Sequence, residues 1–136
     1  MANHRKTRGY KTQRNVADFL FDNGWLHAEA IGAGEAGDDI KGVPFAIEVK
    51  ARSDFQPLAW LKQIRNRSTG IRPIQMVVMR FNGQGDNAAE YGCMMSFDQA
   101  VQLLKMAGYV SEQIDRCRKC GQWNVQGRTC TACKEK

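Results

Sequence analysis

The sequence predicts a mixed α/β domain followed by a short cysteine-rich tail. Apolar residues recur at helical spacing in residues 10–23, several short strand-like runs follow, and the most apolar of these spans residues 73–81. The last twenty residues instead hold two Cys-x-x-Cys pairs. A chain of 136 residues can bury one core and carry a small appendage. We place the domain at residues 1–110 and the tail at residues 111–136.

The first half of the domain is predicted to form one helix and three strands. Residues 10–23 form the helix, and Gly24 is positioned to cap its C-terminus. The segment WLHAEAI (residues 25–31) has the composition of a strand. After a glycine-rich loop, DIKG and VPFAIEVKA are two further strands, joined by a turn at residues 42–44.

The second half is predicted to form two helices and two strands. Residues 56–67 place Leu58, Leu61 and Ile64 on one helical face, and residues 73–81 form a buried strand. A short strand, YGCMMS, is expected to bury Cys93 as a small residue. Residues 97–107 form the last helix, capped by Ser96 and ended near Gly108. The predicted order is helix, three strands, helix, strand, strand, helix.

The charged residues are distributed unevenly along the chain. Residues 1–14 hold five Lys or Arg and no acid, whereas residues 15–50 hold seven acids and two Lys. An acidic segment set between basic ones suits a nuclease, which needs carboxylates for a metal and cations for phosphate. A solvated surface of uneven charge explains the same pattern. No apolar run approaches a membrane span, and the basic N-terminus lacks the apolar region of a secretory signal, so we expect an intracellular protein.

The glycine-rich loop GAGEAG, residues 32–37, matches the G-x-G-x-x-G pattern of dinucleotide-binding proteins. In those proteins the loop opens a helix whose N-terminus faces the pyrophosphate. Here DDIKGVP follows, and its Gly42 and Pro44 leave no room for such a helix. We therefore interpret the loop as a place of close approach to another backbone, either of protein or of nucleic acid.

The tail holds the most specific local signal. Cys117 and Cys120 form one Cys-x-x-Cys pair, and Cys130 and Cys133 form the second after nine intervening residues. This spacing suits a zinc ribbon, in which four thiolates close the coordination sphere of a structural Zn²⁺. The alternatives are disulfides, which an intracellular chain disfavours, and a redox site, which needs only one pair. The neighbouring Lys and Arg residues and Trp123 suit contact with nucleic acid, although Trp123 equally suits the core of a small knuckle.

The strand FAIEVKA carries charge in an otherwise apolar run. Residues two apart share a face of a strand, so Glu48 and Lys50 project together, and Asp39 on the preceding strand can lie beside them. Two close carboxylates repel unless a cation separates them, and Mg²⁺ favours one or two carboxylates with water and phosphate. The pattern indicates metal-assisted phosphodiester hydrolysis, with Lys50 orienting or deprotonating the attacking water. The alternative is a surface ion pair worth under about 1 kcal/mol.

Asp39, followed after eight residues by Glu48-Val49-Lys50 and preceded by a helix, resembles the motif of the PD-(D/E)xK nuclease superfamily. The predicted element order is similar to the αβββαβ core of that restriction-endonuclease-like fold, which has a mixed central sheet. Within it, the chain is most similar to archaeal-type Holliday junction resolvases and their phage relatives. They share a basic N-terminus, a loop rich in Ser or Gly, the Asp and an IEVK-type strand. The resemblance covers residues 5–82 and leaves the zinc-ribbon tail outside.

The resemblance implies a DNA endonuclease that uses Mg²⁺ or Mn²⁺, with Asp39 and Glu48 as metal ligands and Lys50 as the catalytic lysine. Gln13 stands where those resolvases carry a Glu in the first helix, and it can coordinate through its carbonyl without bringing charge. Other acids that can replace this Glu are Glu29, Glu35 and Asp38. The Pro-Asp of the family is Asp38-Asp39 here.

Branched DNA is the expected partner, together with a second copy of the chain, because resolvases cut paired strands symmetrically as two-fold dimers. The candidate nucleic-acid contacts are Arg5, Lys6, Arg8, Lys11, Arg14, Arg52 and Gln63. Residues 97–107 or the edge of the strand at 73–81 are candidate dimer contacts. Two alternatives stay open: a non-catalytic zinc-ribbon module on a degenerate nuclease fold, and a nuclease that acts on RNA.

Overall fold

The computed structural model describes residues 2–32, 38–51, 54–67, 74–111, 113–130 and 132–134. By its internal contacts the chain divides into two compact units, Met1–Ser96 and Phe97–Lys136. Helix α3 (Phe97–Met106) therefore belongs to the second unit, whereas the sequence analysis placed the boundary after this helix, near residue 110. Within the described ranges, no helix is long and apolar enough to span a membrane.

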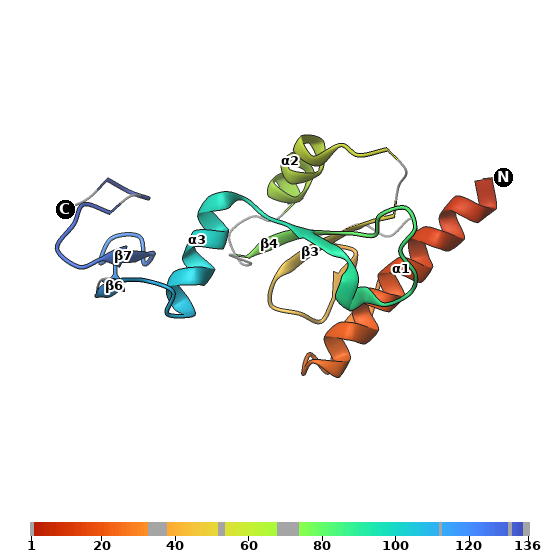
Figure 1. Ribbon diagram of the computed structural model, residues 1–136, viewed down its shortest axis with the longest axis horizontal. Helices are drawn as coiled ribbons and strands as arrows, with labels where there is room; N and C mark the ends of the chain where they lie inside the picture. The colour runs from red at the N-terminus through yellow and green to blue at the C-terminus, as the bar shows by residue number, and fades with distance from the viewer. Residues whose placement is uncertain are drawn as a thin grey trace. The chain divides into compact units, whose positions relative to one another are not determined.

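The first unit contains two helices, five strands and one short 3₁₀ helix in the described residues (Figure 1). The mixed α/β class and the predicted order of elements are confirmed. The elements are α1 (Ala2–Asp22), β1 (Glu29–Ala30), β2 (Ile40–Lys41), β3 (Ala46–Lys50), α2 (Pro57–Arg67), β4 (Gln75–Met79), η1 (Ala88–Glu90) and β5 (Gly92–Met94).

The strands form a small mixed arrangement around β3 and β4. Strands β3 and β4 run parallel with α2 as the crossover between them, and β5 pairs antiparallel with β4. Strands β1 and β2 form a separate antiparallel ladder. The N–H of Asp39, just before β2, donates to the carbonyl of Ile47 at 3.2 Å and so connects this ladder to β3. The order of elements brings Asp39 beside the middle of β3.

Strand β3 is buried on both faces, which explains its apolar density. Ile47 and Val49 pack in one cluster with Val16 and Ala17 of α1. Ala46, on the opposite face, packs in a second cluster on the side of α2. The other buried members of this second cluster are Trp60, Ile64, Val77 and Met79. Because side chains alternate along a strand, α1 and α2 cover opposite faces of the sheet, and Glu48 and Lys50 belong to the α2 face (Figure 1).

The segment after α1 differs from the expected strand at residues 25–31. Gly24 has φ +106°, and the N–H of Trp25 donates to the carbonyl of Leu20 at 3.0 Å, which is a Schellman cap. The ring of Trp25 then contacts Phe45 edge-on at 5.4 Å between centroids. The expected strand covered residues 25–31, but the first of these residues form the helix cap and its hydrophobic contact. Strand β1 is therefore limited to Glu29–Ala30.

Two other expectations for the first unit need correction. Helix α1 begins at Ala2 and not at residue 10, so the basic N-terminus is part of this helix. Cys93, expected to be buried, is exposed in β5.

The second unit combines α3 with the antiparallel pair β6 (Ile114–Arg116) and β7 (Trp123–Val125). Polar side chains join the helix to the ladder. The Nζ of Lys105 donates to the carbonyl of Trp123 at 2.8 Å, and the amide oxygen of Gln102 accepts from the N–H of Trp123 at 2.9 Å. No residue of α3 is fully buried, so this unit has only a small apolar core in its described part.

Candidate functional site

Glu48, Lys50 and Gln63 form a closed hydrogen-bonded triangle on the α2 face of the sheet. The Nζ of Lys50 lies 2.9 Å from Oε1 of Glu48 and 2.9 Å from the amide oxygen of Gln63. The amide nitrogen of Gln63 donates to the same Oε1 of Glu48 at 3.1 Å. Each of the three side chains therefore fixes the other two. Gln63, a predicted contact to nucleic acid, is bonded to both members of the charged pair.

Asp39 is held against the same strand by the backbone. Its Oδ2 accepts the N–H of Val49 at 2.7 Å, which is a short charge-assisted bond. Val49 lies between Glu48 and Lys50 in the sequence, so the carboxylate of Asp39 reaches β3 at the level of the charged pair. Asp39 lies at this position because only a short turn joins β2 to β3. Gly42 permits that turn with φ +78°, and a Cβ there would overlap the carbonyl of His27.

These residues and residues from the N-terminal part of α1 line a cleft of ≈ 490 Å³. Asp39, Glu48 and Lys50 line one side of it, and Gln13 lines it from the helix. The Oε1 atom of Gln13 is buried and has no hydrogen-bond partner among the described residues. A buried acceptor without a donor is uncommon in folded proteins and calls for a specific explanation. Here it indicates that a cation or a donor group belongs in the cleft.

Two of the predicted basic residues also line this cleft, namely Lys6 and Arg8 of α1. Lys11 instead pairs with Asp86 at 2.9 Å on the surface, and its hydrogen bond lowers the pKa of that carboxyl below the usual value. Arg14 is exposed and does not line the cleft. The side chain of Arg5 and the whole of Arg52 lie outside the described residues.

The two alternative acids that the structure describes, Glu29 and Asp38, do not line the cleft. Glu29 pairs with Lys41 at 3.5 Å across the β1–β2 ladder, and Glu35 lies outside the described residues. Asp54, which sequence reasoning missed, does line the cleft and is exposed. Its position just beyond the carboxyl end of β3 is a signal that the sequence carried, because ligands of parallel sheets bind at that end.

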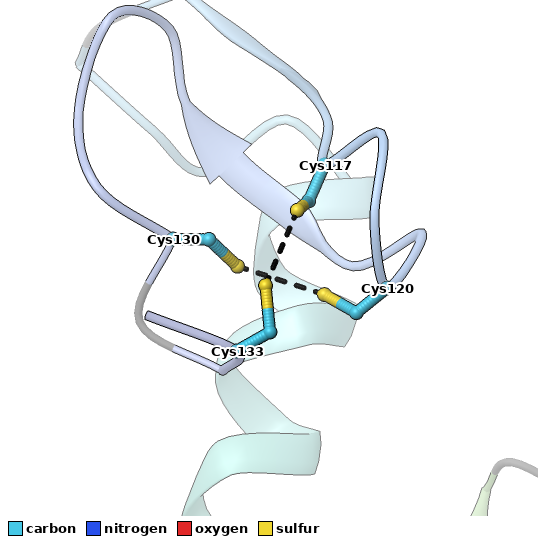
Figure 2. Close-up of side chains that lie close together, drawn as sticks. All are labelled: Cys117, Cys120, Cys130 and Cys133. Atoms are coloured by element: carbon cyan, nitrogen blue, oxygen red, sulfur yellow. Dashed lines mark hydrogen bonds between the residues drawn. The ribbon is translucent and has the colours of Figure 1, made fainter. Parts of the chain in front are cut away.

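The four cysteines of the tail converge on one point (Figure 2). All four Sγ atoms lie within 4.8 Å of one another, and the closest pairs are Cys117 with Cys133 at 3.5 Å and Cys120 with Cys130 at 3.6 Å. Zn–S bonds of about 2.3 Å in a tetrahedron place sulfurs about 3.8 Å apart. No disulfide joins the four cysteines. The cluster therefore can bind a zinc ion, as its spacing predicted.

The two Cys-x-x-Cys turns share one backbone geometry. The N–H of Gly121 donates to the carbonyl of Cys117 at 2.8 Å, and the N–H of Lys134 donates to that of Cys130 at 2.9 Å. Both residues follow the second cysteine of their pair, and both have positive φ, +73° at Gly121 and +60° at Lys134. A lysine in this region is strained by its Cβ, so the second turn keeps its shape against a local preference.

Backbone N–H groups also point at the first sulfur of each turn. Those of Cys120 and Lys119 lower the pKa of the Cys117 thiol from its usual value. Those of Cys133 and, to a lesser extent, Ala132 lower the pKa of the Cys130 thiol to about 6. Hydrogen bonds to a sulfur stabilise the thiolate, which is the form that coordinates a metal. The first cysteine of each turn, Cys117 and Cys130, is therefore favoured as a metal-binding thiolate.

A hollow of ≈ 320 Å³ beside the cluster is lined by several cations, among them Arg116, Arg118, Lys119 and Arg128. Arg116 lies over the ring of Trp123, with its guanidinium carbon 4.6 Å from the ring centroid. This contact is a cation–π pair that fixes the orientation of Arg116.

Comparison of the chain with protein-family models, curated proteins and solved structures gave no match. The chemical reading of both sites therefore comes from their geometry.

Proposed function

We propose that this chain is a metal-dependent DNA endonuclease that hydrolyses phosphodiester bonds, with branched DNA such as a four-way junction as its substrate. One observation carries the proposal. Asp39, Glu48 and Lys50 line one cleft together with the unpartnered acceptor of Gln13. Cations from α1 line the same cleft, as a phosphate-binding site needs.

The residues of the cleft fit a hard divalent cation such as Mg²⁺ or Mn²⁺. Such ions take oxygen ligands, mainly carboxylates and amide carbonyls, together with water and phosphate. Asp39, Glu48 and the orphaned Oε1 of Gln13 supply three oxygen-bearing side chains. A bound ion would supply positive charge at the phosphate and a water that loses its proton more readily.

The side chains around the cleft have separate roles in this proposal. Lys50, which Glu48 and Gln63 hold in place, brings a fixed positive charge to the position where charge develops on the phosphate. It also orients the attacking water. Lys6 and Arg8 lie along α1 and hold the DNA backbone by charge. Gln63 acts through Lys50 and is a positioning residue.

The fold supports the proposal by its order of elements. The order agrees with the αβββαβ core of restriction-endonuclease-like nucleases, since one helix, three strands, a helix and a strand follow one another. Strands β3 and β4 are parallel. On this basis we extend the proposal to a two-fold dimer, which would cut the paired strands of a junction symmetrically. We also propose that the four-cysteine cluster holds one structural Zn²⁺, because four thiolates leave no open coordination position.

A cleavage panel tests the proposed activity. Labelled four-way junction, flap, linear duplex and single-stranded DNA are incubated with Mg²⁺, Mn²⁺ or EDTA, using the wild type, Lys50→Ala and the control Lys62→Ala. Lys62 is an exposed lysine of α2 outside the cleft. We expect metal-dependent nicks at the junction that are lost in Lys50→Ala and kept in Lys62→Ala. Absence of cutting on every substrate, or equal cutting by both variants, contradicts the proposal.

A second candidate function is non-catalytic binding of nucleic acid through the tail. One observation favours it: among the described residues, the cysteines form the one group of three or more His, Cys, Asp or Glu side chains that can share an ion. Asp39, Glu48 and Asp54 line one cleft but do not form such a group in the described residues. DNA binding without cleavage in the panel above supports this candidate against the nuclease.

A further inference from the structure

A second pocket lies at the carboxyl ends of the parallel strands β3 and β4. It has a volume of ≈ 290 Å³, and its lining includes Lys50, Phe55, Trp60, Arg80, Phe81 and Asn82. Ligands of parallel sheets bind outside the carboxyl ends of the strands, so the position itself favours a binding site. The volume is at the lower limit for drug-sized ligands, about 300 Å³, and leaves room for one planar ring system.

Aromatic rings form the floor and walls of this pocket. Trp60 is 6% exposed and belongs to the core cluster, whereas Phe55 and Phe81 are 60% and 42% exposed. The ring of Phe55 contacts Trp60 edge-on, with centroids 5.6 Å apart, and lies 6.3 Å from Phe81. A buried Trp thus anchors two Phe side chains whose ring surfaces stay in contact with solvent.

The wall formed by residues 80–84 is held by hydrogen bonds. The N–H of Phe81 donates to the amide oxygen of Gln84 at 2.8 Å, and Nε of Arg80 donates to the carbonyl of Gln84 at 3.1 Å. Gly92 of β5 makes room for the Phe81 ring, because a Cβ at Gly92 would lie 2.7 Å from Cε2 of that ring. The ring of Phe81 therefore occupies the space that a side chain at Gly92 would fill.

Lys50 lines both this aromatic pocket and the cleft of Asp39 and Glu48. The two hollows are therefore neighbours that share one side chain. We propose that the aromatic pocket receives an unpaired nucleobase of the DNA strand whose phosphate is bound in the cleft. This inference rests on the proposed nuclease function and defines its substrate class as DNA with an unpaired base beside the scissile phosphate.

Charge and polarity favour a nucleobase over an apolar protein segment. The pocket carries cations at its edge, Lys50 and Arg80, and the amide of Asn82, which can hydrogen-bond to a base edge. The neighbouring cleft adds Lys6 and Arg8. A nucleobase matches the aromatic pocket while its phosphate meets Lys6 and Arg8 of the cleft, whereas an apolar side chain from a second protein makes no use of those two cations.

The pocket also supplies a physical reason for selecting branched DNA. Removing a paired base from a duplex costs a few kcal/mol, and the cost is least for a base that is already unpaired. Stacking on aromatic rings is tolerant of base identity, because every base has a π-face. The chain should therefore select DNA by the presence of an unpaired base and not by sequence.

The first test measures affinity in Ca²⁺, which supports binding without requiring cleavage, for a paired duplex and the same duplex with one unpaired nucleotide. We expect the wild type to favour the second DNA, and Phe55→Ala or Phe81→Ala to weaken its binding about 5- to 150-fold. Gly92→Ala keeps both rings but displaces Phe81, and should also reduce the preference. Phe97→Ala removes a Phe that is 83% exposed and belongs to the other unit, so it is the matched control.

The second test uses 5-iodouracil at the unpaired position and photocrosslinking, with the crosslinked peptide identified by mass spectrometry. A crosslink to Phe55, Trp60 or Phe81 is the expected result. If the wild type cuts DNA but these variants keep the preference for an unpaired base, the inference is wrong and the nuclease proposal stands. If no DNA is bound or cut, both fall. If the Phe variants change only self-association, measured by sedimentation, the pocket holds a side chain of a second copy and the inference is overturned.

Discussion

The Nζ atom of Lys50 lies 2.9 Å from Oε1 of Glu48, and both side chains are almost excluded from solvent, at 11% and 5% exposure. A buried ion pair of this kind is weak evidence for stability, because the desolvation of both charges offsets their attraction. Apolar residues of similar size would fill the same space between β3 and α2 at no greater cost. The pair is therefore better explained by the chemistry of the adjacent cleft than by packing.

The first prediction concerns the stability of this pair. Lys50→Met leaves the carboxylate of Glu48 buried without its ammonium partner, and we expect the free energy of unfolding to fall by about 3–5 kcal/mol. The double variant Glu48→Gln/Lys50→Met removes both charges and should recover most of that loss. Urea unfolding of the three proteins gives the comparison. A double variant as unstable as Lys50→Met would show that lost packing, and not an uncompensated charge, is the cause.

The second prediction concerns Gln63, which bridges the two charges. Gln63→Leu removes one acceptor from Lys50 and one donor to Glu48, so the ammonium loses one of the two side chains that hold it at the cleft. Under the nuclease proposal, kcat should fall about 10-fold or more, since a lost positioning contact is worth about 1.5–3 kcal/mol for a charged partner. KM should change little. Asn66→Leu, at an exposed position of the same helix, is the control and should leave kcat unchanged.

The two-residue period of a strand predicted which residues of β3 share a face. The spacing of the two Cys-x-x-Cys pairs predicted the cysteine cluster. Neither pattern predicted that Gln63 meets Lys50 and Glu48, because helical spacing orders residues around α2 without fixing how the helix is rotated over the sheet. That rotation is set by Trp60 and Ile64, which fill the space above Val77. The contact is thus a consequence of core packing, which a sequence pattern does not encode.

Local composition gave the wrong prediction for the segment after Gly24 and for Cys93. The segment after Gly24 has strand-like residues, yet the Schellman cap takes Trp25 into a turn against Phe45. Cys93 has the small apolar character of a buried residue, but it is exposed in β5. In both cases the tertiary surroundings outweighed residue preference.

The third prediction concerns metal removal. The unit Phe97–Lys136 has no fully buried residue in α3, and units of about 40 residues or fewer usually need a metal or disulfides to fold. We expect one Zn²⁺ per chain, and a chelator should unfold β6 and β7 while the first unit keeps its structure, as followed by NMR. Cys130→Ser should lose the metal, whereas Cys93→Ser, at an exposed cysteine outside the cluster, should keep it. A β6–β7 pair that survives the chelator would contradict a structural metal.

The last prediction uses the difference between the two cysteine turns. Gly121 and Lys134 occupy the same position after their Cys-x-x-Cys pairs and share a positive φ, but only Lys134 has a Cβ. A left-handed conformation costs a non-glycine residue about 1–2 kcal/mol, so Lys134→Gly should tighten zinc binding by up to about 10-fold. Gly121→Ala should weaken it by a similar factor.

The control for this prediction must separate backbone strain from charge. Lys119→Gly also removes a lysine beside the cluster, but Lys119 has no positive φ to relieve. It should therefore leave zinc affinity unchanged or lower it, because glycine adds freedom to the unfolded chain. Competition with a chelator of known affinity measures all three variants. Equal gains for Lys134→Gly and Lys119→Gly would assign the effect to charge, whereas a gain for Lys134→Gly alone would show that the second turn holds its lysine under strain because the metal site requires that turn.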